Sequence, residues 1–231
     1  MSQDSYEDLI ARILTHCRQV ARDMKPPRFG WKRQGEEWIR VELVGQYVSE
    51  HKSFIALNKP FQGQELSFAF PPVTQQQLRA TEQQLGFSLP PLLRLLYAQI
   101  ANGGFGPGYG ITGAVEGYRF CDISLQGDIV QAYHQAVEEA STYRQSFLDH
   151  FLTLDPEEQK ARELSGWVDA LPSFWPERFL PLCQWGCNIS TYLNADTEQI
   201  FQGMSGPDLL IAASLEEWLE RWLAGEELQF M

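Results

Sequence analysis

The sequence has few basic residues and no long apolar run. Its 18 lysines and arginines are outnumbered by 30 aspartates and glutamates, which gives a formal net charge of -12. Phosphate backbones are bound by clustered cations, so this balance argues against direct binding of nucleic acid. No apolar run reaches the roughly 20 residues that a helix needs to span a bilayer. The polar start, Met1-Ser2-Gln3-Asp4, does not have the pattern of a secretory signal. We therefore expect a soluble, cytoplasmic protein without membrane contact.

Cysteine is also scarce. The chain has four cysteines in 231 residues: Cys17, Cys121, Cys183 and Cys187. A chain of this size does not depend on disulfides, so we expect free thiols in a reducing compartment. Two of them, Cys183 and Cys187, would hold zinc only if two more ligands came from elsewhere. The four histidines lie in separate predicted elements without paired spacing. We therefore predict no metal and no cofactor.

The usual catalytic motifs are missing as well. There is no nucleophile elbow, metalloprotease helix or cysteine-protease signature. The run Gly108-Tyr109-Gly110-Ile111-Thr112-Gly113 has the spacing of a dinucleotide-binding fingerprint. It follows a predicted helix, however, whereas the fingerprint must follow a strand and open a helix. We interpret the run as a chance match in a glycine-rich loop and predict no catalytic residues.

What the sequence does contain is enough apolar material for a core, with 44% hydrophobic residues. Apolar residues recur at helical spacing from Tyr6 to Met24, which predicts an N-terminal helix. Two short strands are indicated over residues 38–44 and 53–57. Residues 61–72 are typical of a linker. We predict that residues 1–70 form an appendage and residues 71–231 form the main domain.

The most informative stretch covers residues 73–109. Thr74 and Gln77 have the spacing of a capping box at a helix start, and Gly86 is placed to end that helix. A second helix begins near Pro90, because proline is tolerated in the first turn. A glycine loop over residues 102–109 follows. This order of helix starts and stops is uncommon.

The C-terminal half is predicted to contain a long helix after Ile129, a charged insertion starting at Asp155, a sheet and a closing helix. The sheet is a β-meander over residues 179–182, 189–193 and 199–202. Ser214 and Glu217 predict a capping box for the last helix. Helices first, strands next and one helix last indicate the α+β class, with an antiparallel or mixed sheet and helices packed mainly on one face.

Several of these segments together resemble the SUKH superfamily, which includes fungal cell-wall-assembly regulators and bacterial immunity proteins. The resemblance rests on the helix over residues 73–86, Leu89-Pro90, Asn102-Gly103-Gly104, the strands over 179–196 and the helix over 214–223. It implies an α+β domain without a catalytic centre that acts by binding other proteins. Bacterial members commonly neutralise toxins, many of them nucleases.

Seven residues are predicted as partner-binding candidates. Glu82 lies near the apolar face of its helix and can anchor either backbone amides or a partner. Aromatic residues at a sheet edge can serve as partner anchors or as cover for the core. The candidates are Glu82, Asn102, Phe105, Tyr109, Trp185, Asn188 and Tyr192.

The leading hypothesis is therefore a non-catalytic protein-binding module, of the immunity type or a related regulatory scaffold, that is a monomer or a weak homodimer. Its partner would be a protein, with a basic toxin such as a nuclease favoured by charge complementarity. One alternative is a small-ligand binder or an enzyme that uses the loop over residues 102–113, with Glu82 and Tyr109 as polar groups. A second is self-association through the N-terminal helix and exposed tryptophans.

Overall fold

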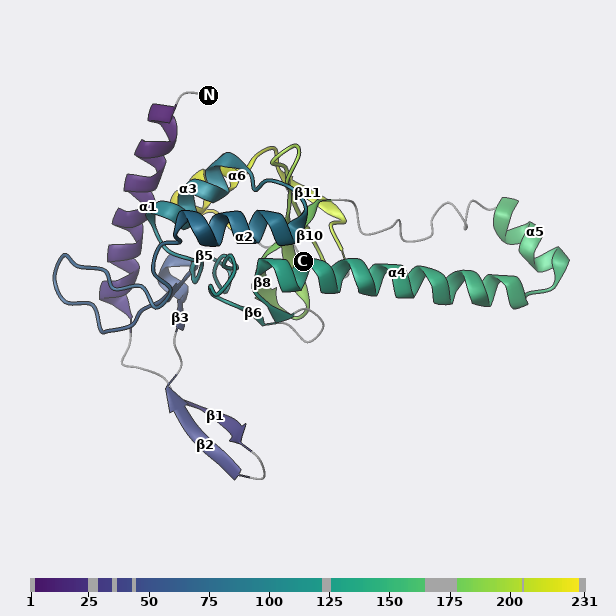
Figure 1. Ribbon diagram of the computed structural model, residues 1–231, viewed down its shortest axis with the longest axis horizontal. Coiled ribbons are helices and arrows are strands. Elements are labelled where there is room, and N and C mark those ends of the chain that lie inside the picture. Colours follow the sequence, from purple (N-terminus) through teal and green to yellow (C-terminus); the bar gives the residue numbers. More distant parts are fainter. Residues whose placement is uncertain are drawn as a thin grey trace.

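The computed structural model of the chain describes residues 3–24, 29–34, 37–42, 45–121, 126–164, 178–204 and 206–228 (Figure 1). The helices are α1 (Gln3–Asp23), η1 (Ser49–His51), α2 (Gln75–Leu85), α3 (Pro91–Gln99), α4 (Ile129–Thr153), α5 (Pro156–Leu164) and α6 (Leu215–Leu223). The strands are β1 (Phe29–Gln34), β2 (Glu37–Glu42), β3 (Gly45–Val48), β4 (Ser53–Ala56), β5 (Phe105–Pro107), β6 (Phe120–Cys121), β7 (Gln126–Gly127), β8 (Phe179–Gly186), β9 (Ile189–Asn194), β10 (Ile200–Gly203) and β11 (Leu209–Ala212). The predicted α+β class is confirmed.

All strand pairs among the described residues are antiparallel. The largest sheet has the order β11-β10-β9-β8, and a second sheet has the order β3-β4-β5. Pairs β1-β2 and β6-β7 form separate two-stranded sheets. The predicted strands correspond to β2, β4, β8, β9 and β10, whereas β1, β3, β5, β6, β7 and β11 were not predicted. Strand β11 begins with two exposed leucines and lacks the alternation that identifies a half-buried strand.

The N-terminal helix α1 buries a stripe of residues at helical spacing, among them Leu9, Ile13, Cys17 and Val20. These side chains belong to the same hydrophobic core as those of α3 and α6. Strand β4 pairs with β5 across the predicted linker. The two sides of the predicted boundary at residue 70 thus share one core, and a separate division into domains stays a prediction.

The ends of α2 agree with the sequence. The Thr74 hydroxyl accepts a hydrogen bond from the Gln77 amide at 3.2 Å, and the Gln77 side chain accepts one from the Thr74 amide at 2.9 Å. Gly86 then takes a left-handed conformation with a φ of 80°. Both local predictions for this helix are confirmed, because short-range hydrogen bonds alone decide them.

The closing helix α6 differs in detail from its prediction. The Ser214 hydroxyl accepts from the Glu217 amide at 3.1 Å, as expected. The Glu217 carboxylate, however, accepts from the amide of Ala213 at 2.8 Å, one residue before the cap. The reciprocal half of the predicted capping box is therefore wrong, although the helix starts where the sequence places it.

Helix α4 is the longest element. It begins at the predicted place, where the Asp128 carboxylate accepts from the amides of Val130 and Gln131 at 3.1 Å each. Its C-terminal half extends away from the sheets, with α5 at the far end (Figure 1). Asp155 caps α5 by accepting from the amides of Glu157 and Glu158. The predicted charged insertion therefore includes a short capped helix.

Candidate functional site

The loop between α3 and β6 is held by its own buried polar groups. The Asn102 side chain, 3% exposed, accepts from the Ala114 amide at 2.7 Å and donates to the Val115 carbonyl at 3.1 Å. Gly103 has a φ of 75°, and a Cβ atom there would lie only 2.6 Å from the Ile111 carbonyl oxygen. Asn102 and Gly103 therefore close the loop on itself, which explains why these residue types occur here.

The same loop joins the two larger sheets. The Tyr109 amide donates to the Gln184 carbonyl at 2.7 Å, and the Thr112 amide donates to the Leu182 carbonyl at 2.8 Å. Both carbonyls belong to β8, the outer strand of its sheet, so the loop occupies that edge. The backbone amides of Tyr109 and Thr112 are in this way used for pairing with β8, whereas Tyr109 as a residue stays 43% exposed.

Two more of the predicted candidates lie inside the protein. Phe105 is fully buried and contacts the ring of Phe68, with 6.1 Å between the centroids. Tyr192 is 2% exposed and belongs to a small cluster with Phe179 and Ala132. Together with Asn102, these residues do not present their side chains to a partner. Their burial gives them a packing role.

Glu82 takes one of its two predicted roles, that of a backbone anchor. Its carboxylate accepts from the Leu89 amide at 3.0 Å and pairs with the Arg94 guanidinium. The Glu82 side chain is 16% exposed. It therefore connects the end of α2 to the beginning of α3.

The three remaining candidates, Tyr109, Trp185 and Asn188, lie near one another. A Cβ atom at Gly108 would approach the Trp185 ring to 3.2 Å, and one at Gly186 would lie 3.4 Å from the Tyr109 ring. Asn188 is in the two-residue turn that follows Gly186 and joins β8 to β9. The glycine loop thus lies against the β8-β9 hairpin, with Tyr109 beside β8 and with Asn188 exposed in the turn of that hairpin.

Tyr47 on β3 completes this region, and the sequence prediction missed it. Its ring makes an edge contact with Tyr109, with 6.0 Å between the centroids and 63° between the planes. Tyr47 is 37% exposed and Tyr109 is 43% exposed. We call the group formed by Tyr47, Tyr109, Trp185 and Asn188 the aromatic surface. Tyr47 lies in a four-residue strand that has no alternation of apolar and polar residues, so the sequence does not indicate that it belongs to a binding surface.

Two of the histidines, which lie in separate elements as predicted, meet in a second cluster that their sequence spacing does not indicate. His16 and His51 lie in edge contact, with 5.6 Å between their ring centroids, and Trp222 packs against His16 at 4.8 Å. The buried Ser53 hydroxyl lies 2.9 Å from both His16 Nε2 and Trp222 Nε1, and it donates to the His51 carbonyl at 2.6 Å. Burial, followed by the charge of His51, lowers the pKa of His16 to about 4.

This cluster does not form a catalytic triad. The Ser53 side chain is buried and its proton is donated to a backbone carbonyl, so it is not an exposed nucleophile. The Asp23 carboxylate contacts His51 at 2.6 Å rather than His16. The cluster instead ties α1, β4 and α6 together through polar contacts.

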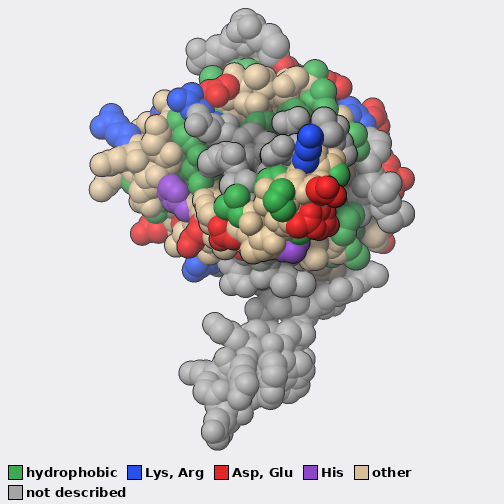
Figure 2. Space-filling model, turned by 90° about the vertical axis from the view of Figure 1, so that its right-hand side faces the viewer, with side chains coloured by type: hydrophobic (Ala, Val, Ile, Leu, Met, Phe, Trp, Pro, Cys, Tyr) green, Lys and Arg blue, Asp and Glu red, His purple; other side chains and the backbone are tan. Residues whose placement is uncertain are grey.

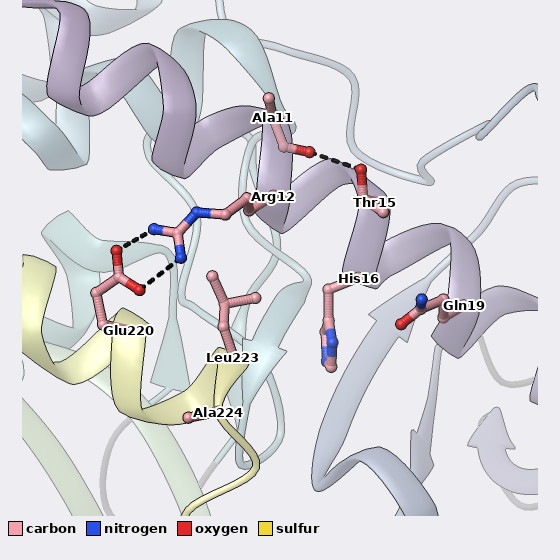
Figure 3. A pocket seen from close by; sticks show the side chains of 8 residues that line it. All are labelled: Ala11, Arg12, Thr15, His16, Gln19, Glu220, Leu223 and Ala224. Carbon is pink, nitrogen blue, oxygen red and sulfur yellow. Dashed lines mark hydrogen bonds and ion pairs between the residues drawn. The ribbon is translucent and has the colours of Figure 1, made fainter.

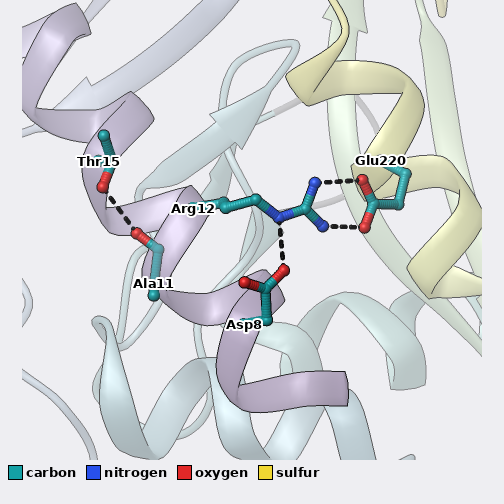
Figure 4. A network of polar contacts seen from close by, with 5 residues as sticks. All are labelled: Asp8, Ala11, Arg12, Thr15 and Glu220. Atoms are coloured by element: carbon teal, nitrogen blue, oxygen red, sulfur yellow. Dashed lines mark hydrogen bonds and ion pairs between the residues drawn. The ribbon is translucent and has the colours of Figure 1, made fainter. Parts of the chain in front are cut away.

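A pocket of about 450 Å³ opens beside this cluster, between α1 and α6 (Figure 3). It is lined by Ala11, Arg12, Thr15, His16, Gln19, Glu220, Leu223 and Ala224. The Arg12 guanidinium pairs with both oxygens of Glu220 and with Asp8 (Figure 4). The Thr15 hydroxyl donates to the Ala11 carbonyl at 2.9 Å. The charged groups of the wall are thus compensated by each other, and none of residues 102–113 lines the pocket.

Metal ligands and membrane spans can be assessed for the described part of the chain. Within it, no group of three or more histidine, cysteine, aspartate or glutamate residues is placed to hold a metal ion. Of the two cysteines that lie four residues apart, Cys183 is buried and Cys187 is exposed. No helix among these residues has the length and apolarity that crossing a membrane requires.

Fold and site together define the class: an α+β domain that places aromatic side chains on a glycine loop beside the edge of an antiparallel sheet. The family model of the SMI1 / KNR4 family (SUKH-1) matches residues 72–221, more than half of the chain. The chain therefore belongs to this family, and the predicted SUKH membership is confirmed. Comparison with curated proteins and with solved structures finds no match.

Proposed function

We propose that the chain is a non-catalytic protein-binding module that contacts its partner through the aromatic surface. The observation that carries this proposal is the pair of exposed rings, Tyr47 and Tyr109, in contact with each other beside Trp185. Partly exposed aromatic side chains of this kind supply most of the binding energy at many interfaces. Two further candidates from the sequence, Trp185 and Asn188, are included in the proposed surface.

The backbone beneath this surface is fixed before any partner arrives. The Tyr109 amide is held by its hydrogen bond to the Gln184 carbonyl, and the Trp185 ring nitrogen donates to the Thr191 hydroxyl at 2.8 Å. A surface that is already ordered loses little conformational entropy on binding. The partner therefore meets a preformed surface, which lowers the entropy cost of binding.

Family membership and charge support an immunity-type or regulatory role in the cytoplasm. The net charge of -12 attracts a basic partner, of which a nuclease toxin is one example. Figure 2 shows acidic side chains spread over one face, with apolar and basic side chains among them. The Asn102 and Thr112 side chains of the loop over residues 102–113 are used internally, which favours partner binding over the alternative of ligand binding or catalysis.

The proposal is tested by measuring binding to the product of the neighbouring gene in the native host. We expect the wild-type chain to form a complex, and Tyr109→Ala to raise the Kd by about 30-fold, since an interface hot spot contributes about 2 kcal/mol. Leu152→Ala is the matched control, because Leu152 is an apolar side chain with 71% exposure on α4. A complex that Tyr109→Ala and Tyr47→Ala leave unchanged would contradict the proposed surface, and absence of any complex would contradict the function.

A further inference from the structure

The aromatic surface has a feature that specifies the chemistry of its partner. Resting on the proposed function, we infer that the partner places an arginine side chain against the rings of Tyr47 and Tyr109, with its guanidinium paired to the carboxylate of Glu227. The argument depends on the two rings, on the position of Glu227 and on the charge of the chain.

The two tyrosine rings provide a binding face for a cation. Because Tyr47 and Tyr109 meet edge to face at 63°, they form a corner rather than a flat stack. Each of the two residues keeps more than a third of its surface exposed. The face of an aromatic ring attracts a cation within about 6 Å of the centroid. A planar guanidinium can stack on one ring while the other ring borders it.

Glu227 supplies a negative charge to the same corner. The neighbouring Leu228 is 2% exposed, and its carbonyl accepts from the Gln202 side chain at 3.3 Å. The same Gln202 nitrogen donates to the Thr191 hydroxyl at 3.4 Å, and that hydroxyl accepts from the Trp185 ring at 2.8 Å, so this end of the chain is anchored beside the aromatic surface. Burial, followed by Tyr109 and then by the charge of Glu227, raises the pKa of the Tyr47 phenol. Tyr47 therefore stays protonated and neutral near neutral pH.

Glu227 is also the carboxylate that is available here. The adjacent Glu226 is paired with Arg221 at 2.8 Å. Glu227 is exposed and makes no ion pair with any residue that the structure describes. An apolar partner side chain in this corner would desolvate the carboxylate without compensating its charge, which is unfavourable.

Arginine fits this corner better than lysine does. Its flat guanidinium can stack on a ring and at the same time offer two N–H donors to a carboxylate, whereas a lysine ammonium is a compact, strongly hydrated charge. A basic partner is also drawn to a chain with a net charge of -12. The geometry and the charge thus point to the same side chain.

The first test uses acetyl-arginine amide as the probe and NMR signals of the tyrosine rings as the readout. We expect saturable shifts of Tyr47 and Tyr109 with a Kd on the order of 1 mM, typical of a fragment of this size. The citrulline analogue, which has the same shape without the charge, should produce no saturable shift. Glu227→Gln should abolish the response to the arginine probe. Glu157→Gln on α5 is the control, because it removes one exposed charge elsewhere. Equal responses to both probes, or no response to arginine, would overturn the inference.

The second test uses the protein partner and separates the two proposals. We expect Glu227→Gln to raise the Kd of the complex about tenfold, while Glu157→Gln leaves it unchanged. If Tyr109→Ala weakens the complex but Glu227→Gln does not, the aromatic surface stands and the arginine site is refuted. If the wild-type chain forms no complex, the proposed function fails, and the probe titration decides the arginine site by itself.

Discussion

Replacing Glu82 with alanine tests whether this partly buried carboxylate stabilises the fold. The substitution removes the acceptor of the Leu89 amide, which lies 3.0 Å away, and the ion-pair partner of Arg94. Leu89 is 3% exposed. Water therefore has little access to the amide that loses its acceptor.

The expected loss of unfolding free energy is about 3 kcal/mol. A hydrogen bond to a charged acceptor contributes about 1.5–3 kcal/mol. The ion pair adds less than about 1 kcal/mol, because the Arg94 side chain is 35% exposed and solvent screens it. Glu82→Gln keeps an oxygen acceptor for the Leu89 amide and should cost only about 1 kcal/mol.

Urea unfolding of the wild type and both variants measures these differences. For a chain of 231 residues, each kcal/mol also lowers the Tm by about 3 °C. If Glu82→Ala costs less than about 0.5 kcal/mol at an unchanged m-value, the anchoring role is refuted. If Glu82→Gln costs as much as Glu82→Ala, the ion pair rather than the Leu89 amide carries the effect.

Two further predictions concern stability. The pKa of His16 is lowered to about 4 from an ordinary 6.5, so between these pH values the unfolded chain binds a proton that the folded chain does not. The free energy of unfolding should therefore fall by up to about 3 kcal/mol as the pH falls from 6.5 toward 4. Urea unfolding at pH 5 and pH 7 should show a smaller difference for His16→Gln than for the wild type, and equal differences would contradict this. Cys187 has a φ of 51° in the hairpin turn, so Cys187→Gly should raise the unfolding free energy by about 1 kcal/mol, while Cys187→Ala, which keeps the strained conformation, should not.

Sequence reasoning predicted elements whose ends depend on neighbouring residues. The cap at Thr74, the stop at Gly86 and the start of α4 near Ile129 all follow from bonds within a few residues. The short strands β1 and β3 were missed because their partners, and not their own sequences, place them in sheets. The local sequence pattern therefore does not predict strands that depend on pairing with another part of the chain.

The candidate site was predicted in part, for a related reason. Residue type identified Asn102, Phe105 and Tyr192 as candidates, but an amide or an aromatic ring can face either the core or the solvent. Only the packing decides this, and it buries all three. The histidine cluster was missed because His16 and His51 are brought together by the contact of α1 with β4. The number of residues between two histidines does not indicate whether their side chains are in contact in the folded protein.

The aromatic surface combines parts of the chain that differ in their relation to the family. Tyr109 and Trp185 lie within residues 72–221, which match the family model, whereas Tyr47 and Glu227 lie outside them. In the arginine site that we propose, the matched domain supplies one ring and the rigid frame, and the flanking segments supply the second ring and the carboxylate. Family membership alone therefore does not specify the partner of this chain. A variant that retains the matched domain but loses Tyr47 and Glu227 should keep the fold of the glycine loop and lose the preference for arginine over citrulline.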